Sequence, residues 1–277
     1  MIIAKISDGF GNQLFMYACG YAMAKRFNTK LMLDVSYLDT NVLRRYELDK
    51  LNIYFNRLFS VSDYKFYPLK VLCRKLVHIW MRCCYHFFYE DKGSGYESNI
   101  QHLSNNTYLF GYWQSEKYFL NYRSDLLKMF TPKYKLSDGC RDYIKEVGTC
   151  QSVALHVRRG DYVELGNCLD VKYYNEAIEK INSQITNPIY YVFSDDLEYA
   201  KQMFAEKVGI YKYVEYKSEN QTLDDFFIMK ECHHIIMANS SFSWWAAWLN
   251  NYMDKIVICP RIKQWDGDFY PKDWIKL

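Results

Sequence analysis

The sequence predicts an α/β fold made of two nucleotide-binding-type domains, each built on a parallel sheet. The chain opens with a strand, a glycine turn and a helix within residues 1–22. From Ser152 onward, short apolar runs alternate with helical segments, and a charged stretch with proline and glycine at residues 131–150 separates the two halves. Strands that alternate with helices are typical of a parallel sheet covered by helices. We therefore expect one domain over residues 1–140 and a second over residues 141–277.

The first elements follow from the pattern at the start of the chain. Residues 1–6 form an apolar run that predicts a strand, residues 8–13 form a glycine turn, and apolar residues recur at helical spacing over residues 14–22. A second strand is expected at residues 29–35, after which the pattern becomes irregular and helical. The free amides of a helix N-terminus favour negative charge. The turn has only two of the three glycines of the dinucleotide fingerprint, so many α/β domains without a ligand begin in the same way.

The second half predicts a longer alternation of strands and helices. Strands are expected at residues 152–157, 189–193, 213–216, 234–238 and 255–259, and helices at residues 172–183, 197–204, from 223 onward and at 243–251. Open α/β sheets bind their ligands at the carboxyl ends of the strands. Polar residues that directly follow these strands are therefore candidate binding residues.

Composition excludes several classes of protein. Half of the 277 residues are hydrophobic and the formal net charge is only +3. Because no block of like charges occurs, we expect no nucleic-acid partner. The nine cysteines lie scattered without C-x-x-C spacing, which predicts reduced thiols, most of them small core residues. Residues 1–6 predict a strand rather than a signal peptide, so we expect the protein in the cytoplasm.

Residues 71–89 form an aromatic and basic segment with two interpretations. The segment contains too many polar groups to span a membrane. A basic helix with Trp80, Phe87 and Phe88 would suit the surface of a membrane. The alternative is an ordinary helix packed on its domain with its cations in water, which we favour because such helices are common. Peripheral contact with the inner face of the membrane stays open.

The most informative motif follows the strand at residues 152–157 and runs from His156 to Tyr162. It places Arg158 and Arg159 at a strand end, immediately before a glycine. Arginine is always charged, and its planar group fits phosphate oxygens with two parallel hydrogen bonds. The motif therefore predicts a diphosphate site. A structural ion pair between arginine and aspartate is the alternative.

Two further strand ends carry polar residues. Asp195 and Asp196 follow the strand at residues 189–193, and a carboxylate there suits the N1–H and amino group of guanine, although one of these residues is expected to cap the next helix. Ser240 and Ser241 precede the helix at residues 243–251. Small hydroxyls at a helix N-terminus fit phosphate oxygens.

We expect no metal site and no cofactor. Cys232, His233 and His234 are adjacent, but neighbouring residues of one element point in different directions. Asp266 and Asp268 resemble a paired-aspartate metal signature, but they lie near the end of the chain and not after an internal strand. A solvated turn is the favoured interpretation.

The combined motifs resemble the bacterial α-1,2-fucosyltransferases. The pattern of that family is G-x-G-N-Q-L-F near the start, H-x-R-R-G-D-Y, a strand ending Y-V-F-S-D, and N-S-S-F-S-W-W. All four stand in this chain, beginning at Gly9, His156, Tyr191 and Asn239, and residues 111–118 add a further match. The chain departs from the family at Asp8, where a second glycine is common, so the shape of that turn is open.

The resemblance implies an α/β fold of the GT-B type, with two Rossmann-like domains facing each other across a cleft. The second domain would bind the donor, GDP-β-L-fucose, and the first would bind the acceptor, a β-galactoside glycan such as a lipid-linked surface polysaccharide. The 2-hydroxyl of a terminal galactose would attack the anomeric carbon with inversion while GDP leaves. Neither a metal nor a cofactor is implied.

The resemblance also implies roles for single residues on the donor side. Arg158 would bind the β-phosphate, and Arg159 would assist it or pair with Asp161. His156 and Asp195 would contact the ribose and the guanine. Phosphate oxygens would be held beside Ser240, Ser241 and Phe242.

On the acceptor side, the implied substrate contacts come from the first domain and comprise Gly11, Asn12, Gln13 and Trp113. Asn12 would face the reacting sugar. The motifs do not identify one general base. Asp8 and Glu116 are the candidates, and direct transfer of the proton to water is the alternative.

Two rival functions remain at this point. The first is a fucosyltransferase that makes another linkage, which analysis of the product would separate. The second is a non-catalytic protein that binds a sugar nucleotide or glycan on the same scaffold, which would show nucleotide binding without turnover.

Overall fold

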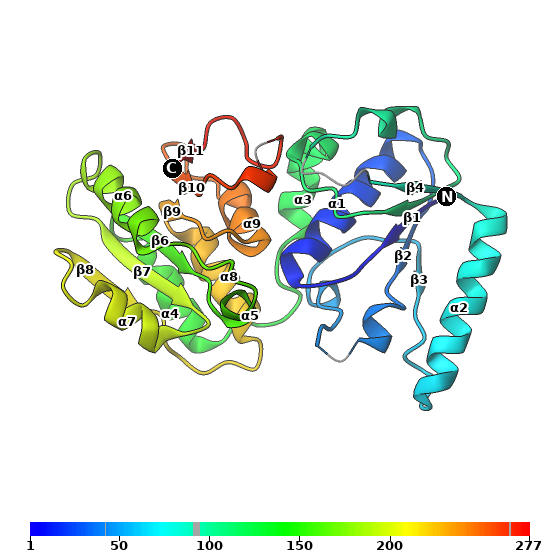
Figure 1. The fold of residues 1–277 in the computed structure, drawn as a ribbon, viewed down its shortest axis with the longest axis horizontal. Helices are drawn as coiled ribbons and strands as arrows, with labels where there is room; N and C mark the ends of the chain where they lie inside the picture. Colours follow the sequence, from blue (N-terminus) through cyan, green and yellow to red (C-terminus); the bar gives the residue numbers. More distant parts are fainter. Residues whose placement is uncertain (42, 91–94, 266) are drawn as a thin grey trace. The chain divides into compact units, whose positions relative to one another are not determined.

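The computed structural model describes residues 1–41, 43–90, 95–265 and 267–277. It divides into two compact units (Figure 1): Met1–Tyr134 with Gln264–Tyr270, and Lys135–Lys263 with Pro271–Leu277. The division precedes residue 140 because that position lies inside helix α4 (Asp138–Val147), which begins at the Ser137 cap. The sequence did not predict that a segment near the C-terminus groups with the first unit.

The first unit contains a five-stranded parallel sheet in the order β3-β2-β1-β5-β4. Its strands are β1 (Ile2–Lys5), β2 (Leu31–Asp34), β3 (Arg57–Phe59), β4 (His86–Tyr89) and β5 (Thr107–Phe110). The sequence predicted β1 and β2 but not the other three. The helix expected over residues 71–89 ends at Cys84, and Phe87 and Phe88 lie in β4, where Phe87 stacks on Tyr108 at 4.3 Å between ring centroids.

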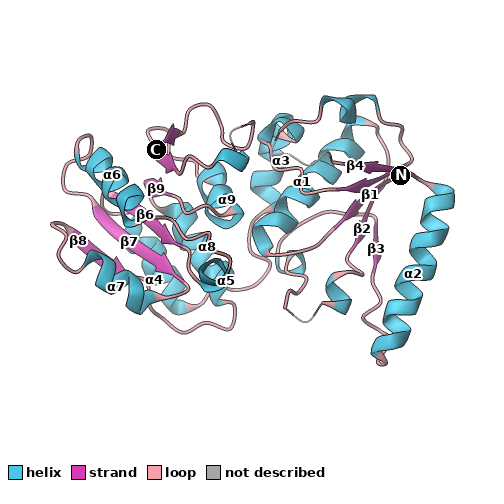
Figure 2. Ribbon diagram, viewed as in Figure 1, coloured by secondary structure: helices cyan, strands magenta, loops and turns pink. Residues whose placement is uncertain are grey.

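Helices cover both faces of this sheet (Figure 2). Helix α1 (Phe10–Arg26) lies against the face that carries Ala4, where a Cβ on Gly20 would come within 2.7 Å of the alanine Cβ. Helix α2 (Tyr67–Cys84) packs on the opposite face through Met81, which belongs to the cluster around Ile3. Helix α3 (Arg123–Met129) follows β5 in the chain. The short 3-10 helices are η1 (Leu38–Thr40), η2 (Leu48–Lys50), η3 (Ser98–His102), η4 (Glu116–Tyr118), η5 (Leu120–Tyr122) and η6 (Lys263–Trp265).

The second unit contains a six-stranded parallel sheet in the order β11-β10-β9-β6-β7-β8. Its strands are β6 (Ser152–Val157), β7 (Ile189–Ser194), β8 (Ile210–Tyr213), β9 (His234–Ile236), β10 (Val257–Cys259) and β11 (Ile275–Lys276). Strand β8 lies before the predicted residues 213–216, because residues 210–213 pair in register with the start of β7. The predicted α/β class with parallel sheets is confirmed in both units.

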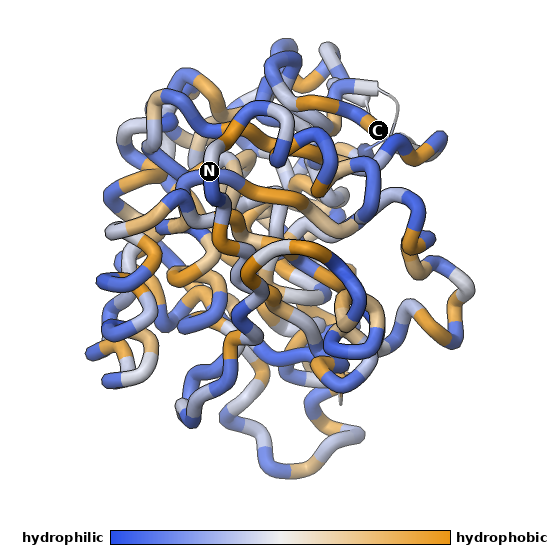
Figure 3. Tube along the Cα trace, turned by 90° about the vertical axis from the view of Figure 1, so that its left-hand side faces the viewer, coloured by the Kyte–Doolittle hydropathy of each residue, from blue (hydrophilic) through white to orange (hydrophobic). Residues whose placement is uncertain are grey.

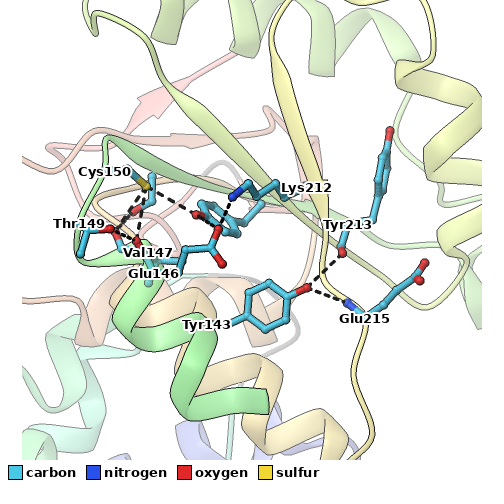
Figure 4. A network of polar contacts seen from close by, with 10 residues as sticks. Tyr143, Glu146, Val147, Thr149, Cys150, Lys212, Tyr213 and Glu215 are labelled. Carbon is cyan, nitrogen blue, oxygen red and sulfur yellow. Dashed lines mark hydrogen bonds and ion pairs between the residues drawn. The ribbon is translucent and has the colours of Figure 1, made fainter. Parts of the chain in front are cut away.

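The helices of the second unit lie on both faces of its sheet. They are α4, α5 (Gly160–Glu164), α6 (Val171–Asn182), α7 (Leu197–Phe204), α8 (Gln221–Glu231) and α9 (Ser241–Leu249). Helices α6 and α7 share one apolar cluster with the strands. On the other face, polar contacts join α4 to the sheet: the Tyr191 hydroxyl donates to Glu146 at 2.8 Å. Lys212 binds the same carboxylate (Figure 4).

The hydropathy of the trace matches this layering. Short hydrophobic stretches alternate with hydrophilic ones along the chain (Figure 3), as expected for strands buried between two layers of helices. All nine cysteines are free thiols, as predicted, but only some are core residues. The buried ones are Cys19, Cys140, Cys232 and Cys259. Among the residues described, no helix combines the length and the apolar character that a membrane span requires. The cytoplasmic location stays a prediction.

Candidate functional site

Three polar motifs meet at one edge of the second sheet. Strand β6 pairs with β7 on one side and with β9 on the other, and all three run in parallel. The residues that follow them therefore emerge at the same edge. This places the arginine motif between Asp195, after β7, and the segment from Asn239 to Ser241, after β9.

Arg158 is held by two carboxylates. One terminal guanidinium nitrogen donates to Asp161 Oδ1 at 2.6 Å, and the other lies 2.6 Å from Asp195 Oδ2. Its side chain is 26% exposed, and the guanidinium carbon lies 5.4 Å from the centroid of the Tyr162 ring. The guanidinium is thus fixed in direction and still reachable from solvent. Such a group can exchange a carboxylate partner for phosphate oxygens.

Arg159 is oriented by different neighbours. Its backbone N–H donates to Asp195 Oδ1 at 2.8 Å, so both oxygens of that carboxylate bind the arginine motif. Its guanidinium stacks on the Tyr199 ring at 3.7 Å from the centroid, and its Nε lies 3.7 Å from Asp196 Oδ2. Asp161, the expected partner of Arg159, forms its ion pair with Arg158. Sequence reasoning missed Tyr199; its place three residues after Asp196, at the start of a helix, was the available signal.

The glycine of the motif is required by two contacts. Gly160 has a φ of +22°, and a Cβ at this position would lie 2.6 Å from Asp195 Oδ2. L-residues rarely adopt such a φ, and the nearby atom belongs to a carboxylate already bound on both oxygens. Because position 160 lacks a Cβ, Asp195 can lie against the turn and bind Arg158.

His156 is a buried neutral base at the same strand end. Its side chain lies 5.7 Å from Phe242 between ring centroids, and its Nδ1 is buried without a hydrogen-bond partner in the described part of the chain. Burial, with a smaller effect of Arg158, lowers the pKa of His156 to about 3. A buried polar atom without a partner calls for an explanation, and a ligand hydroxyl is one.

The start of α9 presents its backbone amides at this edge. The Ser240 hydroxyl caps the helix by accepting from the Phe242 N–H at 3.3 Å. Asn239, to which the sequence analysis gave no role of its own, donates to the Asn167 carbonyl at 2.7 Å, and its Oδ1 is buried without a partner among the residues described. The signal was present, because Asn239 begins the N-S-S-F-S-W-W motif.

In the first unit, Asp8 lies at the end of β1 in a strained conformation. Its φ is +63°, and its carboxylate accepts a hydrogen bond from the Ser7 hydroxyl at 3.0 Å. Burial and the nearby Asp8 carboxylate raise the pKa of Tyr112 to about 12. Aspartate tolerates positive φ better than most residues, and glycine tolerates it best. The backbone angle therefore explains why the resembled family commonly has glycine at this position.

Gln13 and Asn12 organise the loops of the first unit. Gln13 is fully buried; its amide donates to the Asp8 and Arg45 carbonyls at 2.9 and 2.7 Å, and its oxygen accepts from the Glu47 N–H at 3.0 Å. The Asn12 oxygen accepts from the Gln114 amide at 3.0 Å. Gln13 is a positioning residue in this arrangement. The adjacent Gly11 is buried in the first turn of α1.

Trp113 belongs to the core of the first unit. It is 1% exposed and stacks on Phe88 at 5.8 Å between ring centroids. Its backbone N–H donates to Glu90, a half-buried residue that the sequence analysis missed because β4, the strand before it, was not predicted. Burial raises the pKa of the Glu90 carboxyl. Because the Trp113 ring is almost fully buried, it offers no exposed surface for the predicted contact with substrate.

Glu116 begins the short helix η4, and its charge affects the pKa of Arg123. Burial lowers the pKa of the Arg123 guanidinium, and the nearby Glu116 charge acts in the opposite direction. Glu116, in η4, and Asp8, after β1, thus lie in separate segments of the same unit, and both are carboxylates that could act as a general base.

The residues set aside as metal ligands have other partners. Asp266 lies outside the described residues, and Asp268 pairs with Lys117 at 2.6 Å. The His233 ring bonds the Ser152 hydroxyl at 3.1 Å, and His234 Nδ1 accepts from the Ile256 N–H at 3.0 Å. Within the part of the chain that the structure describes, no group of three or more histidine, cysteine or acidic residues is placed to hold a metal ion.

Comparison with known proteins decides the family. The model of the family described as Glycosyl transferase family 11 matches residues 1–277. The chain belongs to glycosyl transferase family 11. It is therefore a glycosyltransferase, and the resemblance to the bacterial α-1,2-fucosyltransferases is confirmed at the level of the family.

Two relatives agree with this family assignment, and one solved structure is similar in fold. The chain is 30% identical to an alpha-1,2-colitosyltransferase of Escherichia coli, over 100% of this chain and 99% of the relative. It is 31% identical to the O-antigen biosynthesis glycosyltransferase WbnK of Escherichia coli, over 98% and 99%. The crystal structure of fucosyltransferase NodZ from Bradyrhizobium aligns with a TM-score of 0.52 and 13% identity, over 89% of this chain and 92% of that one. This likeness supports the fold alone, and the GT-B fold type is confirmed.

Proposed function

We propose that this family 11 glycosyltransferase moves L-fucose from GDP-β-L-fucose to the 2-hydroxyl of a terminal β-galactose, with inversion at the anomeric carbon. The observation that carries the proposal is the Arg158 guanidinium, held 2.6 Å from both Asp161 and Asp195 at the carboxyl edge of a parallel sheet. A group fixed in this way is suited to a departing diphosphate, whose charge grows in the transition state.

On the donor side, each residue of the edge has a part in the proposal. Arg158 binds the β-phosphate, with Arg159 and the amides beside Ser240 and Ser241 completing the cradle. His156 meets the ribose through a nitrogen that has no partner among the described side chains. The positive charges stabilise GDP as the glycosidic bond breaks, and no proton is needed on the leaving group.

The guanine contact of Asp195 stays a prediction of its own. Both oxygens of this carboxylate already bind the arginine motif, so guanine would share them through their second lone pairs. In thermal unfolding, GDP should stabilise the protein and UDP should not. Asp195→Asn should abolish that difference if the carboxylate reads guanine, whereas an unchanged GDP preference would leave Asp195 as a positioning residue for Arg158.

Asp8 is our proposal for the general base. Its carboxylate lies at a strand end, with the Ser7 hydroxyl at 3.0 Å, on a backbone strained at φ +63°, and such strain clusters at functional sites. Asp8→Asn keeps a side chain that tolerates this angle and removes the charge. It should lower kcat about 100-fold or more, as loss of a positioned base does. Glu116→Gln is the matched control; the reverse pattern would make Glu116 the base.

The name of the alpha-1,2-colitosyltransferase relative suggests a second candidate donor, GDP-colitose. Colitose is L-fucose without its 3-hydroxyl. A site that hydrogen-bonds this hydroxyl rejects the deoxy sugar strongly, whereas an apolar site discriminates little. Competition between GDP-fucose and GDP-colitose in one reaction therefore decides the donor. We expect fucose to be transferred in excess.

The acceptor in the proposal is a β-galactoside within a lipid-linked surface polysaccharide, which the name of the O-antigen relative supports. Incubation with GDP-fucose and a panel of β-galactosides should yield one fucosylated product. Nuclear magnetic resonance should show an α linkage to the galactose O2. A linkage to another position would establish the rival fucosyltransferase, and GDP binding without any transfer would establish the non-catalytic rival.

We also propose that transfer needs no divalent metal, because Arg158, Arg159 and helix amides supply the positive charge at the diphosphate. Rates measured in excess EDTA and with added manganese should agree. Loss of activity in EDTA with recovery on manganese would contradict this part of the proposal.

A further inference from the structure

Helix α2 carries an exposed apolar face that the proposed reaction does not use. Five large apolar side chains recur three or four residues apart and so lie on one side of the helix. This outward face consists of Leu69, Leu72, Leu76, Ile79 and Trp80, which are 39%, 51%, 56%, 62% and 57% exposed. Soluble surfaces rarely gather so many large apolar side chains without a partner.

Helix α2 runs along the edge of its own unit (Figure 1), and its opposite side contacts that unit. Met81 is 2% exposed within the core, and the His78 ring bonds the buried Asp34 carboxylate at 2.8 Å. Arg74 donates to the Thr40 hydroxyl at 2.5 Å. The helix therefore packs as the sequence analysis expected, yet with a second apolar side left outward. Met81, His78 and Arg74 thus attach one side of the helix to the unit, and the outward face lies on a different side.

The charges around this face indicate which kind of partner it binds. Residues 64–84 contain five basic side chains and no aspartate or glutamate. The basic residues are Lys65, Lys70, Arg74, Lys75 and Arg82. On the helix, Lys75 and Arg82 follow the outward face along one edge, and both are exposed. A second copy of the face would bring like charges together, whereas an anionic lipid surface complements them.

We propose that α2 lies on the surface of a bilayer containing anionic phospholipid, with its outward face among the lipids and its cations at the headgroups. A helix of 18 residues is about 27 Å long, so it would lie in the plane of the surface and not across it. The contact with the bilayer does not depend on the identity of the sugar. Its role in placing the enzyme beside a lipid-linked acceptor rests on the proposed function.

The test is sedimentation of the full chain with vesicles of phosphatidylcholine alone and with vesicles that contain phosphatidylglycerol. We expect binding to the anionic vesicles only, weakened by added salt. Leu72→Glu with Ile79→Glu should lower the partition coefficient about tenfold or more, because it places charge in the lipid layer. Lys75→Glu with Arg82→Glu should lower it similarly.

The matched control replaces isolated exposed apolar residues elsewhere, Val208 and Met253, which are 93% and 95% exposed. Val208→Glu with Met253→Glu should bind vesicles as the unmodified chain does. Circular dichroism and thermal unfolding check that each variant folds, and the charge variant provides a second readout if the apolar one does not. Failure of the unmodified chain to bind, or equal binding by the face variants, would overturn the proposal. A dimer in solution that Leu72→Glu with Ile79→Glu dissociates would assign the face to a second copy.

Discussion

Each of the two units has a strand, a glycine-containing turn and a helix that carry candidate residues, but the units hold these turns by different interactions. After β1, the turn is fixed by the neutral Gln13 amide, which bonds three backbone groups. After β6, the turn is fixed by charges, with Arg158 between Asp161 and Asp195. An amide with all its partners in the backbone is structural. A guanidinium held by exposed carboxylates is suited to exchange partners with an anion.

The glycines differ in the same way. Gly9 has an ordinary extended backbone with φ of −74°, and a Cβ there would meet nothing closer than 3.9 Å. Gly160 has φ of +22° and no room beside Asp195. In the first turn, the residue with the strained backbone is instead Asp8, whose φ is +63°. A glycine motif in the sequence therefore does not reveal which residue the backbone requires to be glycine.

The largest expected effect separates the charged turn from an ordinary surface pair. Arg158→Lys keeps the charge but loses the planar group that reaches two oxygens, so kcat should fall about 100-fold to 1000-fold. Arg141→Lys on α4 is the matched control, since Arg141 also pairs with an aspartate at the surface. Initial rates of GDP release measure both. A lysine variant with normal turnover would show that Arg158 is only structural.

The next effect compares the two glycines directly. Gly160→Ala should lower the free energy of unfolding by about 1 to 3 kcal/mol, through backbone strain and contact with Asp195. Gly9→Ala should change it by less than about 0.5 kcal/mol. Chemical denaturation of both variants gives the two values. Equal losses would remove the distinction between the turns.

The smallest effect concerns the buried base beside the charged turn. Burial lowers the pKa of His156 to about 3, from 6.5 when unfolded, so only the unfolded chain takes up this proton at mildly acidic pH. The contribution of neutral His156 to the free energy of unfolding is therefore present above pH 6.5 and is lost as the pH falls toward 3. When the pH falls from about 7.5 to about 5.5, the free energy of unfolding should decrease by roughly 1 kcal/mol less for His156→Gln than for the unmodified chain. The exposed His102→Gln should show no such difference; if it does, the acid sensitivity arises elsewhere.

The sequence predicted the charged turn better than the neutral one, for a physical reason. Parallel strands bring their carboxyl ends to one edge, so Arg158 and Asp195 could be placed together from their positions after strands. Two of the three partners of Gln13 lie in an irregular loop at residues 45–47, and the third is the carbonyl of Asp8. No local pattern encodes such contacts. Strands β3, β4 and β5 were also missed, although β1 and β2 are equally short; β3 and β4 are exposed or half-buried, so no buried apolar run marks them in the sequence.

The most direct test of the charged turn as a diphosphate site is the affinity of the unmodified chain for GDP and GMP, measured by titration calorimetry. The two ligands differ only in the β-phosphate that Arg158 is proposed to bind. We expect GDP to bind at least about tenfold more tightly than GMP, and Arg158→Lys to remove most of that difference. Equal affinities of the unmodified chain for GDP and GMP would contradict the account.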